Sequence, residues 1–220
     1  IGGYAGSALM REPDHALTLI EATVKAVKIP VTVKMRLGWD ETSINAPDIA
    51  ARAEAAGVQL ITVHGRTRMQ FYEGKANWDA IAAVRDAIRI PLIANGDVQT
   101  VEDAHDILRC SGADAVMIGR GCQGRPWHAG VLAGHAGPAA SEMSDVVVEH
   151  YRAMLEHYGA EVGVRHARKH LGWYLDRHAP DLASEAKASI MTSKDQSFVV
   201  EALQRALSDH GGASARQEAA

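Results

Sequence analysis

Four short runs of apolar residues recur in the first half of the chain, at residues 31–35, 60–63, 91–94 and 115–118. They are rich in β-branched residues, and each follows a helix-like stretch and is bounded by glycine or proline. Continuous apolar runs of this length are typical of parallel strands that are buried on both faces of a sheet. The pattern therefore predicts four βα units joined in one parallel sheet.

The segments between these runs carry residues that begin and end helices. Asn45 and Asn77 each precede a helical pattern and can cap it. Thr100 and Asp103 are spaced as in a capping box, and Gly112 is placed to end the same helix. These signals support a helix between each pair of strands.

Beyond about residue 141 the strand pattern disappears. Three helical stretches are predicted there, near 144–158, 161–178 and 182–207. Residues 134–138 are predicted to be a linker. The tail after His210 is small and polar, so it is predicted to be disordered. The chain is therefore expected to hold an α/β part followed by an all-α part.

Composition narrows the function classes without selecting one. The chain has 220 residues, 47% hydrophobic and 23% charged, which is ordinary for a globular protein. A formal net charge of −4 does not suggest a nucleic-acid-binding protein, although a local basic face can occur on an acidic chain. No apolar run approaches the roughly 18 residues of a membrane span. Cys110 and Cys122 form neither a zinc pattern nor a disulfide framework, so we expect a cytoplasmic protein without a metal site.

Each predicted strand ends in polar or glycine residues. The first run ends in Lys34 and Arg36, the second in 64–68 (HGRTR), the third in 95–97 (NGD) and the fourth in 119–121 (GRG). In parallel α/β folds, sites are built at the carboxyl ends of the strands. Any one of these groups fits a solvated rim or a turn, but four in succession predict one shared site.

Two of these groups suggest particular chemistry. Glycines let backbone N–H groups approach phosphate oxygens, and an arginine adds charge-assisted hydrogen bonds, so Gly119-Arg120-Gly121 is a candidate phosphate site. Lys34 has two roles open to it. A desolvated lysine can form a Schiff base, whereas a charged lysine can stabilise the negative charge of a reduced flavin.

The helical part contains one basic segment. Arg165, Arg168 and Lys169 lie on one arc of a predicted helix, beside an apolar arc. This basic arc is either a solvated helix face or a surface that contacts the phosphate backbone of a nucleic acid. Trp173 and Tyr174 are interpreted as packing residues rather than as base-stacking platforms.

Taken together, six segments resemble the tRNA-dihydrouridine synthases, and within them the bacterial B-type branch. They run in order and with compatible spacing from about residue 5 to 178. The combination of HGRTR, ANGD and GR followed by QGRPW makes the resemblance specific. The segments are AGSALM (5–10), VTVKMRLGW (31–39), ITVHGRTR (61–68), IPLIANGD (90–97), GADAVMIGRGCQGRPW (112–127) and ARKHLGWYL (167–175).

The resemblance implies a TIM barrel followed by a helical domain. Residues 1–133 would form the C-terminal half of an FMN-binding (β/α)8 barrel, 141–210 a helical tRNA-binding domain and 211–220 a disordered tail. The first half of the barrel and an Asn-x-Gly-Cys-Pro motif, whose cysteine is the family's general acid, are expected upstream of Ile1. Neither Cys110 nor Cys122 fits that role, so this chain by itself is expected to be inactive.

The resemblance also implies a reaction and a set of site residues. In the family, NADPH reduces FMN, which then reduces the C5–C6 bond of a uridine in the tRNA D-loop. No catalytic residue is expected in this chain, except His64 as an assistant, and no membrane, metal or protein partner is implied. The residues expected to bind FMN are Lys34, His64, Asn95, Gly96, Asp97, Gly119 and Arg120. The residues expected to contact RNA are Arg36, Arg66, Arg68, Arg165, Arg168 and Lys169.

Three other interpretations stay open from the residues. Another FMN- or phosphate-binding TIM-barrel oxidoreductase, acting on a small molecule, would not need the basic helical part. An aldolase would use Lys34 as its Schiff-base residue. A non-catalytic RNA-binding fragment would keep the basic arc and lack enzymatic activity.

Overall fold

The structure is a computed structural model that describes residues 5–214, with side chains described through residue 208. It divides into two compact units, Ile1–Gly121 and Cys122–Ala220. The division falls earlier than residue 133, where the sequence placed the end of the barrel part. The reason lies in residues 122–127, whose Trp127 stacks on Tyr174 and whose Gly124 carbonyl contacts the ring of His178, both on a helix of the second unit.

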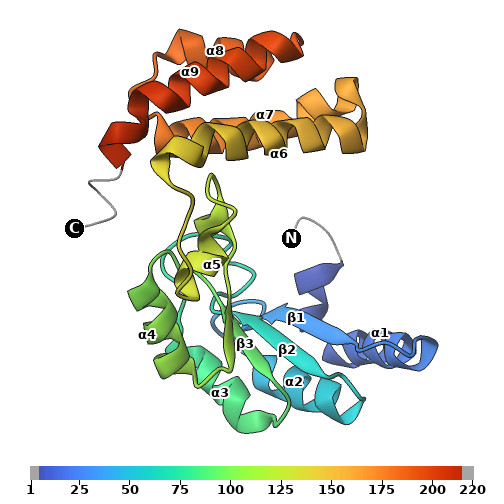
Figure 1. Ribbon diagram of the computed structural model, residues 1–220. Coiled ribbons are helices and arrows are strands. Elements are labelled where there is room, and N and C mark those ends of the chain that lie inside the picture. The colour runs from blue at the N-terminus through green and yellow to red at the C-terminus, as the bar shows by residue number, and fades with distance from the viewer. Residues whose placement is uncertain (1–4, 215–220) are drawn as a thin grey trace. The chain divides into compact units, whose positions relative to one another are not determined.

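The first unit contains a four-stranded sheet in the order β1-β2-β3-β4, and every neighbouring pair is parallel (Figure 1). The four predicted strands are therefore confirmed to within about a residue at each end. The elements of this unit are η1 (Gly6–Arg11), α1 (Pro13–Ala26), β1 (Thr32–Arg36), α2 (Ala46–Ala55), β2 (Leu60–His64), α3 (Asp79–Ala87), β3 (Leu92–Asn95), α4 (Val101–Ser111), β4 (Ala115–Met117) and η2 (Arg120–Cys122).

The connecting helices cover one face of the sheet. Side chains alternate between the two faces of a strand. On the helix-covered face, Ile61, Val63 and Leu92 have no exposed surface, whereas Thr32 and Lys34 on the opposite face of β1 are exposed. The expectation of strands buried on both faces thus holds for one face, because successive right-handed crossovers place their helices on the same side.

The strand register aligns the predicted site residues. Arg36 pairs with His64, His64 with Asn95, and Asn95 with Met117. Partners in a parallel register point to the same face, so this row lies across the carboxyl end of the sheet on the face that the helices leave open. Lys34 lies two residues before Arg36 and points to the same face.

Most of the predicted helix caps are confirmed. Thr100 and Asp103 form a capping box, and Gly112 ends α4 with a φ of 64°. The side chain of Asn77 accepts a hydrogen bond from the Ala80 N–H. The prediction for Asn45 is wrong in its chemistry, because its side-chain amide donates to the Met10 carbonyl instead of capping α2.

The second unit is all helical. The stretch predicted as one helix over 182–207 is two helices, because Ser193 and Asp195 turn the chain and the Asp195 carboxylate accepts from the N–H groups of Ser197 and Phe198. The last helix continues to Ser214, past the predicted start of the tail, and residues 215–220 lie outside the described residues. The helices are α5 (His128–Leu132), η3 (Ala140–Glu142), α6 (Met143–Tyr158), α7 (Ala160–His178), α8 (Ser184–Thr192) and α9 (Gln196–Ser214).

This unit has its own apolar core, made by α6, α7, α8 and α9. Val147, Leu203 and Ala167 are fully buried in it, and Tyr151 is almost so. Within residues 5–214, no helix combines the length and the apolar composition that crossing a membrane requires.

Candidate cofactor and nucleic-acid site

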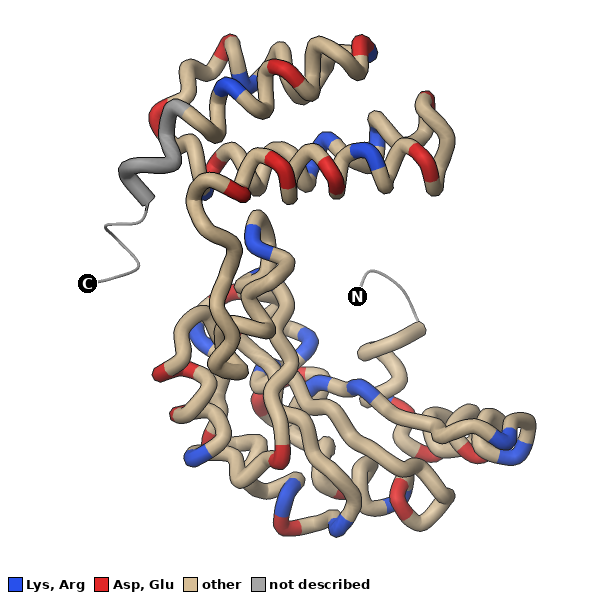
Figure 2. Tube along the Cα trace, in the orientation of Figure 1, with Lys and Arg blue, Asp and Glu red and all other residues tan. Residues whose placement is uncertain are grey.

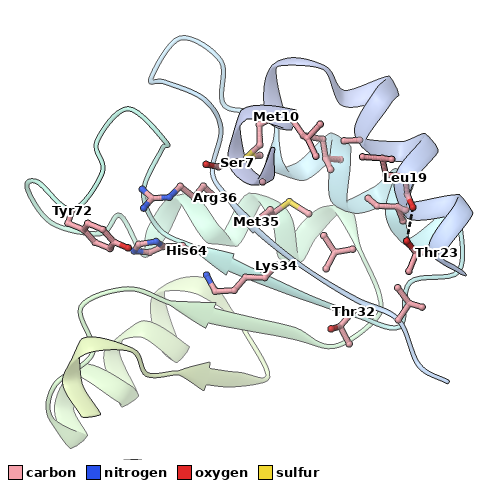
Figure 3. Close-up of a pocket in the computed structure, with 17 residues that line it drawn as sticks. Ser7, Met10, Leu19, Thr23, Thr32, Lys34, Met35, Arg36, His64 and Tyr72 are labelled. Carbon is pink, nitrogen blue, oxygen red and sulfur yellow. Dashed lines mark hydrogen bonds between the residues drawn. The ribbon is translucent and has the colours of Figure 1, made fainter. Parts of the chain in front are cut away.

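A cavity of about 510 Å³ lies beside β1, between the sheet and η1 with α1. Apolar side chains line one end of it, and a polar group of side chains lines the other (Figure 3). No carboxylate is among the described residues that line it. The polar end is therefore electropositive, and it consists of Lys34, Arg36, His64 and Tyr72.

Lys34 lies at this polar end, with its side chain along the open face of the sheet (Figure 3). Burial against the strand, and then the charge of Arg36, lower the pKa of Lys34. A lysine with this environment suits an anionic ligand that can replace its lost hydration. The structure places Lys34 where the sequence predicted it, at the carboxyl end of the first strand.

His64 is 8% exposed and lies in the row between Arg36 and Asn95. Burial, and then the positive charges of Arg36 and Lys34, lower the pKa of His64 to about 4. His64 is therefore neutral at pH 7, and its ring can offer one donor and one acceptor rather than a charge.

Asp97 joins the ends of three strands. Its carboxylate accepts two hydrogen bonds from Arg66, at 2.8 and 2.7 Å, one from the Ala76 N–H at 2.8 Å, and one from Arg120 at 3.2 Å. Burial acts to raise the pKa of Asp97, but the hydrogen bonds from Arg66 and Ala76 outweigh it and lower the pKa. Asp97 has a φ of 59°, which is uncommon for a residue other than glycine.

Arg66 is a buried residue, with 1% of its surface exposed. Besides Asp97, its guanidinium donates to the carbonyls of Glu73 at 3.1 Å and Gly74 at 2.6 Å. A guanidinium with these partners holds the loop after β2 in place. Its geometry supports a positioning role and offers no donor on the surface where an RNA would bind.

Arg36 has a related position. It is 6% exposed, and its Nη1 donates to the carbonyls of Thr67 at 2.6 Å and Phe71 at 2.8 Å. Burial is the largest influence on its pKa, which is lowered. Arg36 both pins the loop over 67–74 and borders the cavity, so it remains within reach of a ligand there.

The glycines of the predicted site differ in what surrounds them. Gly96 has a φ of 133°, and a Cβ there would lie 2.6 Å from the Ala76 Cβ. Gly121 would bring a Cβ to 2.5 Å from the Val98 carbonyl oxygen. A Cβ at Gly119, by contrast, would meet no atom within 4 Å. The backbone at Gly119 is therefore open to a ligand, as a phosphate site requires.

Arg120 stands next to Gly119 and keeps 55% of its side chain exposed. One of its nitrogens contacts Asp97, which leaves further guanidinium donors directed to solvent. Asn95, in the neighbouring strand, donates from its side chain to the Met117 carbonyl at 2.7 Å and so ties β3 to β4. Gly119 and Arg120 together offer open backbone and exposed guanidinium donors, which fit a phosphate group.

Four residues at this edge were not predicted as site residues. Tyr72 lines the cavity, with the Arg36 guanidinium 5.5 Å and that of Arg120 4.7 Å from its ring centre. The other three are Arg11, Trp39 and Phe71: the Arg11 guanidinium lies over the Trp39 ring, and that of Arg68 lies over the rings of Trp39 and Phe71. The available sequence signal was aromatic residues in the loops that follow strands, next to arginines.

The basic residues predicted on the helical unit lie on α7. Arg165 and Lys169 are exposed and Arg168 is half-buried. Figure 2 shows basic positions along α7 and several acidic positions along the neighbouring α6. Tyr174 is buried in the core, where burial raises its pKa to about 12, which confirms that it is a packing residue. Trp173 is half-buried, and the Lys169 ammonium lies 5.9 Å from its ring centre.

Comparison with known proteins shows which family the chain belongs to. The family described as Dihydrouridine synthase (Dus) matches residues 1–210. A "Probable tRNA-dihydrouridine synthase" of Rhizobium leguminosarum bv. phaseoli is 70% identical over 219 residues, which cover 100% of this chain and 69% of that protein. A protein of the same name from Rhodobacter capsulatus is 53% identical, over 96% of this chain and 66% of that protein.

A "tRNA-dihydrouridine synthase B" of Xanthomonas campestris pv. campestris is 45% identical over 182 residues, which cover 80% of this chain and 55% of that protein. The chain thus spans about two thirds of the length of the first two relatives and just over half of the third. The match to the family and the sequence identities are both much stronger than a shared fold alone would give. The chain belongs to the dihydrouridine synthase family.

Proposed function

We propose that this chain supplies the FMN-binding edge and the RNA-binding helices of a tRNA-dihydrouridine synthase that uses NADPH as reductant and acts on a D-loop uridine. The observation that carries the proposal is the row Arg36, His64 and Asn95 at the carboxyl end of a parallel sheet. Lys34 and Arg120 flank this row, so cationic groups stand where a flavin and its phosphate would lie. The four βα units are proposed to be half of a closed barrel, as the family resemblance implies.

The cofactor contacts follow from the exposure of each group. Arg120 and the backbone of Gly119 are proposed to bind the FMN phosphate, because donors and open space coincide there. Lys34 and His64 are proposed to border the ring. When bound, FMN would supply the hydride, and the Lys34 ammonium would stabilise negative charge at the ring. Gly96 and Asp97 shape the site: Gly96 gives close approach and Asp97 holds Arg66 and Arg120.

The RNA contacts are proposed at two places. A uridine within a folded tRNA must leave its stack to reach a flavin at a sheet edge, and Arg36 borders the cavity that would receive it. Arg68 is proposed to contact the RNA at the rim. Arg66 is reassigned from RNA contact to positioning, because it is buried in the ion pair with Asp97.

The second place of RNA contact is the basic arc of α7. Arg165, Arg168 and Lys169 are proposed to contact phosphates there, since RNA is recognised largely by shape and backbone. No catalytic cysteine is assigned to this chain, because Cys110 lies in α4 and Cys122 in η2, outside the cavity.

The test is reconstitution of the full-length protein with FMN, followed by measurement of dihydrouridine on an unmodified tRNA transcript with NADPH. Retained flavin is measured separately, by absorbance after desalting. Arg120→Ala should weaken FMN binding about tenfold or more, since charge-assisted hydrogen bonds contribute roughly 1.5–3 kcal/mol each. Arg109→Ala, on the exposed face of α4, is the matched control and should retain flavin. Absence of dihydrouridine with flavin bound would refute the proposed function.

A further inference from the structure

The loop after β2 exposes three large apolar side chains next to one another. Met69 is 49% exposed, Phe71 41% and Tyr72 52%. These residues lie at the carboxyl rim of the sheet, where the candidate site is. Adjacent exposed apolar side chains at a rim are a mark of a binding surface, whereas a single one would not be.

The loop is held rigidly although its side chains point outward. Arg36 donates to the carbonyls of Thr67 and Phe71, and Arg66 donates to Glu73 and Gly74 from the other side. Phe71 has a φ of 49°, in the left-handed region that bulky residues rarely adopt. A strained residue in a loop that two buried arginines hold is typical of functional loops, where a fixed conformation is required.

Cations and aromatic rings alternate along this rim. The Arg11 guanidinium lies 4.2 Å from the ring centre of Trp39, and the Arg68 guanidinium lies 4.9 Å from the same centre. Arg68 also lies 4.4 Å from the ring centre of Phe71. The series Arg11, Trp39, Arg68 and Phe71 therefore joins η1 to the loops after β1 and β2.

We propose that Trp39, Arg68 and Phe71 form a stacking platform for the unpaired nucleotides that flank the reduced uridine. The inference rests on the proposed function and extends it to residues beyond the flavin site. Aromatic rings interleaved with arginines bind single-stranded nucleic acid without sequence preference, because every base has a π face and every nucleotide a phosphate. Flipping one base out of a loop leaves its neighbours unstacked, and a rim platform compensates for that loss.

The charge of the rim favours RNA over a protein partner. Three guanidinium groups, those of Arg11, Arg68 and Arg120, lie within stacking distance of its aromatic rings. The Asp40 carboxylate on the β1 loop is engaged by the hydroxyl groups of Thr42 and Ser43. An apolar protein surface would not complement this arrangement, whereas a phosphate backbone with bases does.

The test uses the full-length, FMN-loaded protein and an unmodified tRNA transcript. Affinity is measured by fluorescence anisotropy at several salt concentrations, and flavin reduction by NADPH is followed without tRNA. The variants are Phe71→Gly, which removes the ring and relieves the backbone strain, Trp39→Ala, and Trp39→Phe, which keeps a ring. Ile29→Ala removes an apolar side chain that is 72% exposed before the amino end of β1 and serves as the control.

Phe71→Gly and Trp39→Ala should each weaken tRNA binding roughly 5- to 150-fold, the range of lost base stacking. Trp39→Phe should recover most of the affinity, and Ile29→Ala should keep it. The slope of log affinity against log salt should stay unchanged, because no phosphate contact is removed. Flavin reduction should be unaffected.

A change below twofold for both ring-removing variants would overturn the platform, as would an equal loss of flavin reduction, which indicates a structural role alone. A flatter salt slope in Phe71→Gly would also contradict it, since that result assigns the loss to phosphates. If the wild-type protein binds tRNA but forms no dihydrouridine, the proposed function fails while the affinity comparison still decides the platform.

Discussion

Arg66 and Asp97 face each other with paired hydrogen bonds of 2.8 and 2.7 Å, and they are 31 residues apart in the sequence. The Arg66 side chain is 2% exposed and that of Asp97 26%. Through this pair, and through the bond from Arg120 to Asp97, the ends of β2, β3 and β4 are joined at one carboxylate. The pair therefore fixes the edge of the sheet on which the proposed flavin site depends.

Asp97→Ala should lower the free energy of unfolding by about 3–5 kcal/mol, because it leaves the Arg66 charge buried without its partner. The measurement is urea denaturation followed by circular dichroism. Asp106→Ala is the matched control, since it breaks an exposed ion pair with Arg109 and should cost no more than about 1 kcal/mol. Equal losses in the two variants would mean that the Arg66–Asp97 pair contributes no more than a surface pair.

Replacement by alanine should affect stability at Gly96 and cofactor binding at Gly119. Gly96→Ala should lower the free energy of unfolding by about 1–3 kcal/mol, because the new Cβ clashes with Ala76 and crowds the His64 ring. Gly119→Ala should change stability by less than about 0.5 kcal/mol, since its Cβ enters open space. It should nevertheless weaken FMN retention, because that space is where the phosphate is proposed to lie. Full retention of FMN in Gly119→Ala would remove Gly119 from the phosphate site.

His64 should make the fold sensitive to acid. The pKa of His64 is lowered to about 4 in the folded protein, whereas an unfolded histidine has a pKa of about 6.5. Between these values the unfolded chain binds the proton and the folded chain does not, so stability falls as the pH falls from about 6.5 to about 4. The contribution is constant above pH 6.5, and its slope is at most about 1.4 kcal/mol per pH unit.

His64→Gln removes this titration and keeps a polar side chain of similar reach. When unfolding free energies are measured from pH 7.5 to 4.5, that of the wild type should fall relative to that of the variant as the pH falls. His150 and His170, whose pKa values are also lowered, are present in both proteins and so cancel in the difference. Parallel curves would show that His64 is not held neutral by the fold.

The strands could be predicted from sequence because each is a short, β-branched apolar run, and Ile61, Val63 and Leu92, which the helices bury, carry that signal locally. The row of polar residues could be predicted in the same way, because the sequence shows where each apolar run ends and which polar residues follow it. The burial of Arg66 was not predictable, because it depends on a carboxylate in another loop. The approach of Arg11 and Arg68 to the Trp39 ring likewise depends on three separate segments that only the fold brings together.

The same limit explains the helical errors. Asn45 has the sequence of a cap, yet its amide bonds to Met10, a residue far away in the chain. The break between α8 and α9 lies where Ser193 and Asp195 bond to backbone N–H groups, and Ile190 and Val199 on either side of it pack into the same core. Local patterns therefore predicted element types well and their side-chain partners poorly.

The basic arc of α7 is expected to contact the phosphates of the RNA. Arg165 and Lys169 are exposed one helical turn apart on a segment whose described residues 162–175 include no acidic side chain. Replacing both by alanine should weaken tRNA binding and reduce the slope of log affinity against log salt by roughly two, because each phosphate contact contributes close to one unit. FMN retention should not change, since both residues lie on a helix of the second unit.

Arg89→Ala is the control for net charge, because Arg89 is exposed between α3 and β3, at the amino end of the sheet and away from the proposed site. It removes one positive charge from the same protein and should leave the salt slope unaltered. Combining Arg165→Ala and Lys169→Ala with Phe71→Gly separates two kinds of contact, because the first pair changes the slope and the third changes affinity at constant slope. If the double variant binds tRNA like the wild type at every salt concentration, the arc is a solvated helix face, and RNA recognition belongs to the rim of the first unit.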